Sequence, residues 1–324
     1  MPNPRWPAVA WRPEPTRGRL RVGGADRQAF LQNMTTNDVR TLVPGHGQPT
    51  VLVNQRAGIL DWLGLYAEPE TILLVTGPGC GETDTAWLDR YVFSEDVTFS
   101  DITGTTVLYY LTGRDAESVA RALVPDLGTF AIADARLDGH DVKLLGTVGL
   151  EGPGYYLLGP AVAASALSAW LAERGAALSD SDHTRWRIET GVPEVGAELD
   201  ERHNPWEARL DESVSLHKGC YLGQEIVARL YSYHKVQRYL VGFDLPRDVP
   251  AGAKIYADDQ EVGAITSACP TEAGAIALGY VKSAVAEPGK QLTVVHDDDR
   301  LPATVSDRPF WAHLDRKAGL APSS

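Results

Sequence analysis

Short apolar segments, each ended by glycine, proline or aspartate, are the feature that most restricts how this chain of 324 residues can fold. Up to about residue 235, strand-like and helix-like segments alternate at short spacing. This alternation predicts α+β lobes built from split βαβ units. After Val236 only short strand-like runs follow, separated by Gly, Pro and Asp, which predicts a small all-β barrel. The length favours two or three lobes over a single core.

We therefore expect an α+β region over residues 1–235, a β-barrel over residues 236–305 and a polar tail over residues 306–324. The first 18 residues, rich in Pro and Arg, read as an extended lead-in. A helix capped by Asp26 should follow, with Phe30, Leu31 and Met34 on its inner face. Residues 50–54 and 58–66 predict a hairpin. Further helices are expected over residues 82–91, 115–123, 161–174 and 181–190, and barrel strands over residues 239–243, 254–256, 261–267, 275–281 and 291–295.

Composition excludes several function classes. The net charge is −13, from 30 Lys and Arg against 43 Asp and Glu, so general nucleic-acid binding is disfavoured. No apolar run approaches the roughly 18–20 residues that span a bilayer, and the first residues lack the apolar core of a secretory signal. A cytoplasmic protein without a membrane partner is the expectation.

Three cysteines, Cys80, Cys220 and Cys269, lie far apart and form no Cys-x-x-Cys pair. A zinc ribbon, a dithiol redox motif, a self-contained iron–sulfur site and a disulfide framework are therefore not expected. Two weaker signals are better read as structure. The turn over residues 77–81 lacks the third glycine of a dinucleotide-binding loop, and residues 296–299 read as a solvated loop between barrel strands.

The segment Lys218-Gly219-Cys220-Tyr221-Leu222-Gly223-Gln224-Glu225 carries more information. Its two glycines permit tight turning and close backbone approach. A thiol beside a lysine and just before a helix is where a thiolate would be stabilised. A free cysteine is also commonly a small buried hydrophobic residue. From chemistry alone, both interpretations of Cys220 stay open.

This segment resembles the K-G-C-(Y/F)-x-G-Q-E fingerprint of YgfZ-type proteins, iron–sulfur cluster assembly or repair factors of the glycine-cleavage T-protein (aminomethyltransferase) superfamily. Other parts of the chain are similar to superfamily motifs in the same order. They are Phe30-Leu31-Gln32-Asn33-Met34-Thr35-Thr36-Asn37-Asp38-Val39, Arg187-Ile188-Glu189-Thr190-Gly191-Val192-Pro193, Gly196-Ala197-Glu198-Leu199-Asp200, Pro205-Trp206-Glu207-Ala208 and Ala277-Leu278-Gly279-Tyr280-Val281.

The resemblance implies a three-lobed clover-leaf fold with two ferredoxin-like lobes, a small C-terminal β-barrel and a tetrahydrofolate, or a folate derivative, in a central channel. It implies that Glu189 accepts two hydrogen bonds from the pterin, unless it is an ordinary surface helix residue. Candidate walls for the pteroyl ring are Trp186, Trp62, Tyr66 and Tyr221, each of which could equally be core. The candidates for the anionic tail are Arg229, Lys235 and Arg238, with solvated surface charges as the alternative. Lys218 is a further candidate cofactor-binding residue.

One departure bears on activity. Glycine-cleavage aminomethyltransferases carry a pair of aspartates where this chain has Asp61-Trp62, and they lack the cysteine of the fingerprint. The resemblance therefore implies a tetrahydrofolate-binding accessory protein that serves iron–sulfur proteins or their assembly machinery, with Cys220 as its functional thiol. The alternative is an enzyme, a tetrahydrofolate-dependent aminomethyl- or methyltransferase that uses Asp61.

Overall fold

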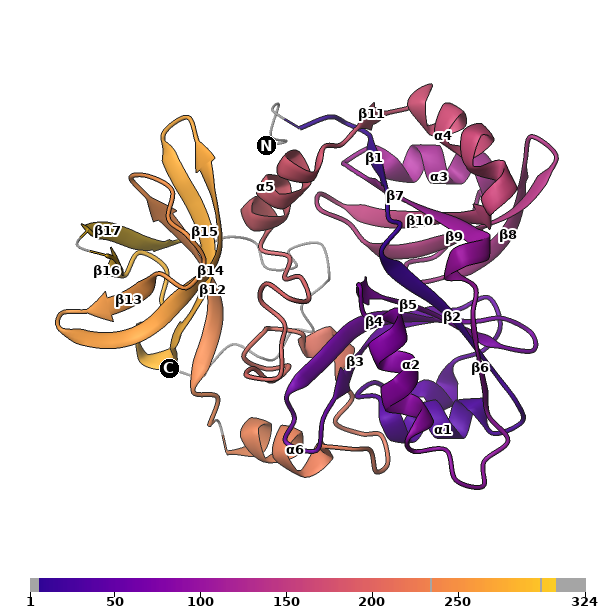
Figure 1. Ribbon diagram of the computed structural model, residues 1–324, viewed down its shortest axis with the longest axis horizontal. Coiled ribbons are helices and arrows are strands. Elements are labelled where there is room, and N and C mark those ends of the chain that lie inside the picture. Colours follow the sequence, from indigo (N-terminus) through magenta and orange to yellow (C-terminus); the bar gives the residue numbers. More distant parts are fainter. Residues whose placement is uncertain (1–5, 234, 298, 307–324) are drawn as a thin grey trace. The chain divides into compact units, whose positions relative to one another are not determined.

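The computed structural model describes residues 6–233, 235–297 and 299–306, and the expected polar tail from residue 307 on lies outside them (Figure 1). The chain divides into two compact units, residues 1–179 with 194–237, and residues 180–193 with those from 238 on. The first unit holds two sheets with their helices, and the second holds a closed barrel with one helix. The expected α+β class with a C-terminal barrel is confirmed.

The first lobe is a five-stranded antiparallel sheet in the order β3-β4-β5-β2-β6. Because β5 lies between β2 and β4, those two strands run parallel without touching, which is a split βαβ unit. Leucine, isoleucine and valine side chains of the sheet pack under the two helices and form the lobe's core. The elements are β2 (Arg17–Gly23), α1 (Arg27–Met34), β3 (Gly47–Val53), β4 (Ile59–Ala67), β5 (Ile72–Pro78), α2 (Gly81–Asp89) and β6 (Thr98–Asp101).

The second lobe repeats this order of strands and helices. Its sheet, β8-β9-β10-β7-β1-β11, matches the first one except that β1 is inserted between β7 and β11. Residues 10–13 of the expected extended lead-in thus form a paired strand. The elements are β1 (Ala10–Pro13), β7 (Thr106–Thr112), α3 (Ala116–Leu123), β8 (Ile132–Leu137), β9 (His140–Val148), β10 (Pro153–Pro160), α4 (Ala164–Ala172) and β11 (Ala176–Ala177). The 3-10 turns Val39–Thr41, Thr103–Thr105 and Ala161–Ala163 join elements of the two lobes.

The helix expected after Asp26 forms, but Asp26 does not cap it with its side chain. Its Oδ2 instead accepts a hydrogen bond of 2.8 Å from the backbone N–H of Asp96. The buried face of α1 holds Phe30, Leu31 and Met34, as the periodicity predicts. The polar side chain at the start of the helix is used to tie down a distant loop, a competition that local sequence does not reveal.

Arg19 makes hydrogen bonds with both of the segments that connect the two lobes. Its side chain is buried and donates hydrogen bonds to the carbonyl oxygens of residues 14, 15 and 17, which connect β1 to β2. It also donates to the carbonyls of Thr103 and Thr106, 2.5 and 3.0 Å away, in the link from β6 to β7. Burial lowers the pKa of Arg19 from its ordinary value. One guanidinium therefore supplies hydrogen-bond donors to the carbonyl groups of both connecting segments.

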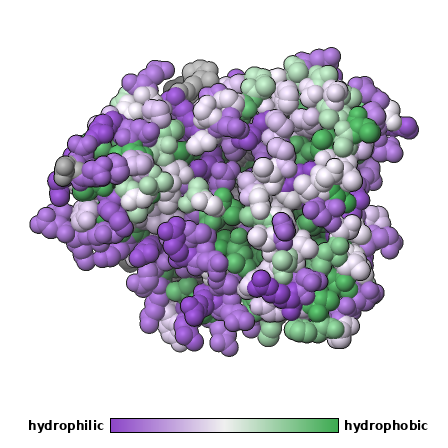
Figure 2. Space-filling view, in the orientation of Figure 1, coloured by the Kyte–Doolittle hydropathy of each residue, from purple (hydrophilic) through white to green (hydrophobic). Residues whose placement is uncertain are grey.

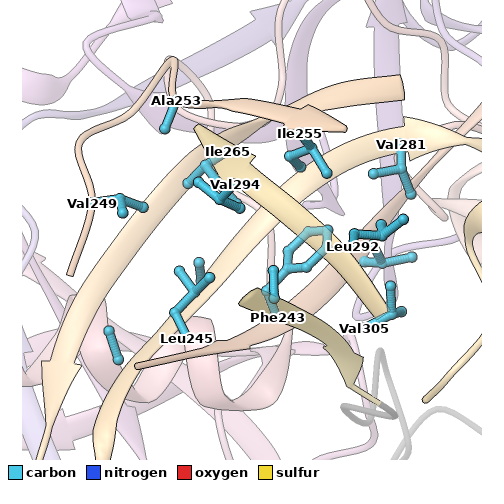
Figure 3. Close-up of a cluster of buried hydrophobic side chains, with 14 of the residues drawn as sticks. Phe243, Leu245, Val249, Ala253, Ile255, Ile265, Val281, Leu292, Val294 and Val305 are labelled. Atoms are coloured by element: carbon cyan, nitrogen blue, oxygen red, sulfur yellow. The ribbon is translucent and has the colours of Figure 1, made fainter. Parts of the chain in front are cut away.

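The second unit is the closed barrel β12-β15-β14-β13-β16-β17 together with helix α5 (Asp180–Thr190). Figure 3 shows side chains such as Phe243, Ile255 and Val294 turned toward one another inside the barrel. The last strand, which the sequence did not predict, closes the barrel by pairing with β12. The strands are β12 (Arg238–Leu245), β13 (Lys254–Ala257), β14 (Gln260–Thr271), β15 (Gly274–Lys282), β16 (Gln291–His296) and β17 (Asp299–Ser306), with a 3-10 turn at Ser283–Val285.

The surface is largely polar on the face that Figure 2 draws. On the face drawn in Figure 2, hydrophilic side chains cover much of the area and hydrophobic ones gather in smaller patches. Among the described residues, no helix has the length and hydropathy needed to cross a membrane.

Candidate functional site

Two of the sequence motifs meet in the first unit. The segment from Ser213 to Leu222 is hydrogen-bonded to the end of α1 and to the residues that follow it. Thr36 Oγ1 donates to the Ser213 carbonyl at 2.6 Å, and the Leu222 N–H donates to the Asn33 carbonyl at 3.0 Å. The fingerprint of residues 218–225 is therefore fixed to the motif of residues 30–39, although nearly 180 residues separate them. The 3-10 turn Asp211–Ser213 begins this docked segment.

Lys218 is the central contact between these two motifs. Its Nζ donates hydrogen bonds to the carbonyl oxygens of Thr35 and Asn37, at 2.5 and 2.6 Å, and lies 4.9 Å from the centre of the Tyr221 ring. Burial lowers the pKa of Lys218 to about 7, an effect that nearby Asp38 partly opposes. The amine is engaged by backbone carbonyls, so its direct role is to hold the loop in place.

Cys220 is exposed on this loop, so the interpretation as a buried hydrophobic residue is wrong. Helix α6 (Gln224–Ser232) begins four residues later, and the residue that precedes it, Gly223, has a φ of +81°. A side chain at Gly223 would place its Cβ 2.6 Å from the Asn54 carbonyl oxygen, so the glycine permits the close backbone approach that the sequence predicts. No such contact surrounds Gly219. The thiol thus sits on a loop anchored at both ends.

Asp61 and Trp62 are neighbours in β4 and point to opposite faces of the sheet. Asp61 is fully buried. Its carboxylate accepts hydrogen bonds from the Gly77 N–H, at 2.9 and 3.0 Å, and from the Trp62 N–H, at 2.7 Å. The Trp62 side chain is half-buried, and its indole N–H donates to Ser213 Oγ at 3.0 Å. Trp62, and not Asp61, therefore touches the segment that carries the fingerprint.

The carboxyl group of Asp61 lies within hydrogen-bonding reach of that of Asp84 on α2, and both side chains are buried. Burial raises the pKa of each carboxyl group, because removing the charged form from water costs free energy. Burial also raises the pKa of the nearby Cys80 thiol, and Asp61 and Asp84 add to the effect. Two carboxyl groups in contact require a proton between them. This pair is the feature of the first lobe that sequence reasoning missed, because Asp84 lies in an ordinary helical pattern.

Arg17 lies close to this carboxyl pair, at the start of β2. Its guanidinium donates to Glu14 Oε2 at 3.3 Å and to the Thr76 carbonyl at 3.1 Å. Burial acts to lower the pKa of Arg17, but Tyr156, Glu14 and further acidic groups outweigh it, and the pKa is raised. Arg17 is therefore a fixed positive charge near Asp61.

In the second unit, α5 carries Glu189 and is attached to the barrel. The buried Arg187 side chain donates to the Val192 carbonyl at 3.0 Å and to Ser267 Oγ at 2.9 Å, beside the bulge of β14. Glu189 is half-buried, and its Oε1 lies 3.5 Å from Nε of Arg185, one turn earlier. Trp186, with 1% exposure, belongs to the buried side of the helix.

The remaining candidates differ in exposure. Tyr66 is fully buried, and its hydroxyl donates to the Gly146 carbonyl of the second lobe at 2.9 Å, so it joins the two lobes. Tyr221 is half-buried at the fingerprint, and burial raises its pKa to about 12. The cations expected near an anionic tail, Arg229, Lys235 and Arg238, are all exposed.

Tetrahydrofolate, the cofactor of this kind of fold, suits the α5 side chains. A half-buried carboxylate can accept the two N–H groups of a pterin edge. Beside it, Nε and Nη2 of Arg185 are buried with no hydrogen-bond partner within the described ranges, and a helix face that receives a polar ligand would leave such atoms open. In the part of the chain that the structure describes, no group of three or more His, Cys, Asp or Glu side chains could hold a metal ion.

The barrel and paired lobes define an aminomethyltransferase-like protein. Residues 15–218 match the GCVT N-terminal domain, and residues 238–311 match the Glycine cleavage T-protein C-terminal barrel domain. The chain belongs to this glycine-cleavage T-protein family, whose aminomethyltransferases bind tetrahydrofolate.

Its relatives carry enzyme names. An Aminomethyltransferase of Geobacillus kaustophilus is 33% identical over 313 residues, which cover 91% of this chain and 85% of that protein. The Arabidopsis thaliana protein named "Putative transferase At1g60990, chloroplastic" is 32% identical over 305 residues, covering 91% of this chain and 69% of the relative. The crystal structure of the glycine cleavage system aminomethyltransferase T from Bartonella henselae has the same fold, with a TM-score of 0.78 and 22% identity over 94% of this chain and 86% of that one.

Proposed function

We propose that this chain is a tetrahydrofolate-binding accessory protein of the YgfZ type, which supports the assembly or repair of iron–sulfur clusters in the cytoplasm. The observation that carries the proposal is the contrast between the exposed Cys220, on a loop fixed by Lys218, and the buried Asp61. Its partners would be folate and iron–sulfur proteins or their assembly machinery.

The environment of Asp61 argues against aminomethyl transfer. A general base must reach the proton that it takes, yet this carboxyl group is enclosed and already accepts hydrogen bonds from two backbone N–H groups, those of Trp62 and Gly77. The neighbouring position, where the aminomethyltransferases have their second aspartate, is Trp62. An indole has no acceptor atom and cannot take a proton from an amine.

The competing proposal is a tetrahydrofolate-dependent aminomethyl- or methyltransferase. It is favoured by the relatives named aminomethyltransferase, some of them 30–33% identical to this chain. Purified protein separates the two functions. Aminomethyl transfer to tetrahydrofolate by wild-type protein, lost in Asp61→Asn at unchanged melting temperature, would support the enzyme and contradict the accessory role.

Replacing Cys220 by alanine is expected to lower the activity of iron–sulfur enzymes several-fold in cells that depend on this protein. The exposed thiol makes no packing contribution, so the variant should accumulate to the wild-type level. The matched control is Cys269→Ala, which removes a buried cysteine of the barrel and should leave those enzymes active. Full cluster-enzyme activity in the Cys220→Ala cells would contradict the proposed role of the thiol.

Replacing Glu189 by glutamine is expected to weaken tetrahydrofolate binding by about 10- to 100-fold, because the amide lacks the charge and one of the acceptors that the pterin edge requires. Isothermal titration calorimetry without air measures the dissociation constants of both proteins. Glu173→Gln, at the exposed end of α4, is the control and should bind like the wild type. Equal affinities for wild type and Glu189→Gln would contradict the proposal that Glu189 binds the pterin.

A further inference from the structure

Two side-chain nitrogen atoms of Arg185 lack a hydrogen bond within the described residues. Its side chain is 17% exposed, and Nε and Nη2 are buried without a hydrogen-bond partner in the described part of the chain. A buried donor left without a hydrogen bond is destabilising, because its lost contact with water is not replaced. The guanidinium is planar and carries its donors in a fixed fork, so its open nitrogens suit a flat acceptor group.

Helix geometry sets Arg185 and Glu189 apart from the barrel. Residues four apart lie on the same side of an α-helix, whereas Arg187 is turned by about 200° from Arg185. Arg187 reaches Ser267 of the barrel. Arg185 and Glu189 therefore project from the opposite side of α5, with Nε and Oε1 3.5 Å apart. The two side chains form an ion pair, so a charged donor and a charged acceptor lie side by side on this face.

We propose that Arg185 is a specificity-determining residue that donates to the ring carbonyl oxygen of the pterin whose N–C–N edge binds Glu189. The inference rests on the proposed folate-binding function and names a further group that recognises the ligand. A reduced pterin presents two N–H donors next to a carbonyl acceptor on one planar edge. Glu189 supplies acceptors and Arg185 supplies charged donors, so the pair on α5 is complementary to that edge.

The alternative ligand group for Arg185 is a carboxylate of the glutamyl tail, since a guanidinium also binds carboxylates well. The position of Glu189 favours the ring. A carboxylate ligand placed on Arg185 would lie beside the Glu189 carboxylate, and two like charges at such a distance repel each other. A neutral carbonyl oxygen meets no such penalty.

Two ligands distinguish these occupants. Arg185→Met should weaken tetrahydrofolate and 6-methyltetrahydropterin, which lacks the tail, by the same factor of about 10- to 100-fold in calorimetry. A loss confined to tetrahydrofolate would assign Arg185 to the tail and overturn the proposal. Unchanged affinity for both ligands would equally overturn it, by leaving Arg185 a structural role only.

The controls separate this proposal from the proposed function. Arg136→Met removes an exposed arginine of the second lobe and should leave both affinities unchanged. If Arg185→Met does not fold, Arg185→Lys keeps the charge but not the planar fork, and the same equal loss for both ligands is expected. Failure of the wild type to bind either ligand would refute folate binding itself, whereas a loss in Glu189→Gln without one in Arg185→Met would refute only the role of Arg185.

Discussion

Replacing Arg19 by methionine is expected to destabilise the first unit by about 3–5 kcal/mol, because several buried carbonyl oxygens lose their donor and each buried group left unsatisfied costs roughly 1–3 kcal/mol. The methionine fills much of the same space but donates nothing. The carbonyl groups of Arg17, Thr103 and Thr106 then lose the donor that both connecting segments share. In a unit of this size the melting temperature should fall by on the order of 10 °C, measured by circular dichroism.

Arg21→Met, on the same strand, is the matched control for Arg19. Arg21 is 37% exposed and pairs with Glu68 at 2.9 Å. Surface pairs of this kind contribute up to about 1 kcal/mol, so the control should melt within a few degrees of the wild type. Similar melting temperatures for the two variants would show that the links between the lobes do not depend on the buried guanidinium.

The sequence predicted most helices and strands of this fold because their signals are local. Strand-like apolar runs marked the hairpin of β3 and β4, and helical spacing marked α1. Strand β1 was not predicted because its partners, β7 and β11, lie about 100 and 165 residues away, and nothing in a Pro- and Arg-rich lead-in reveals them. Strand β17 escaped because its first residues are charged and resemble a turn.

The candidate site was predictable in its parts and not in its contacts. The motifs around Thr35 and Lys218 were found one by one, but their pairing depends on backbone carbonyls that carry no sequence signal. Alternation along β4 implies that Asp61 and Trp62 point to opposite faces. It does not say which face α2 covers, so the burial of Asp61 against Asp84 required the structure.

The Asp61–Asp84 pair should make the stability of the first unit decrease as the pH rises. Both pKa values are raised above the ordinary carboxyl value, first by burial, so the folded state keeps a proton that the unfolded chain releases. A group of this kind stabilises the fold fully at low pH, and its contribution is lost above about pH 4. The loss is about 1.4 kcal/mol per pH unit for each proton retained. Arg17, Cys80 and Glu194 are the neighbouring charged or titratable groups that modify the exact range.

Asp84→Asn is expected to remove this loss, because the amide N–H can donate to Asp61 without taking up a proton. Melting temperatures measured from pH 4 to pH 8 should agree for wild type and variant at the acidic end. At pH 8 the variant should melt several degrees higher, since it no longer holds two ionisable carboxyl groups in contact. Asp89→Asn, at the exposed end of the same helix, changes the net charge equally and should follow the wild-type curve. A variant less stable than the wild type across the whole range would mean that the Asp84 carboxyl is needed for its geometry, and that no proton is shared with Asp61.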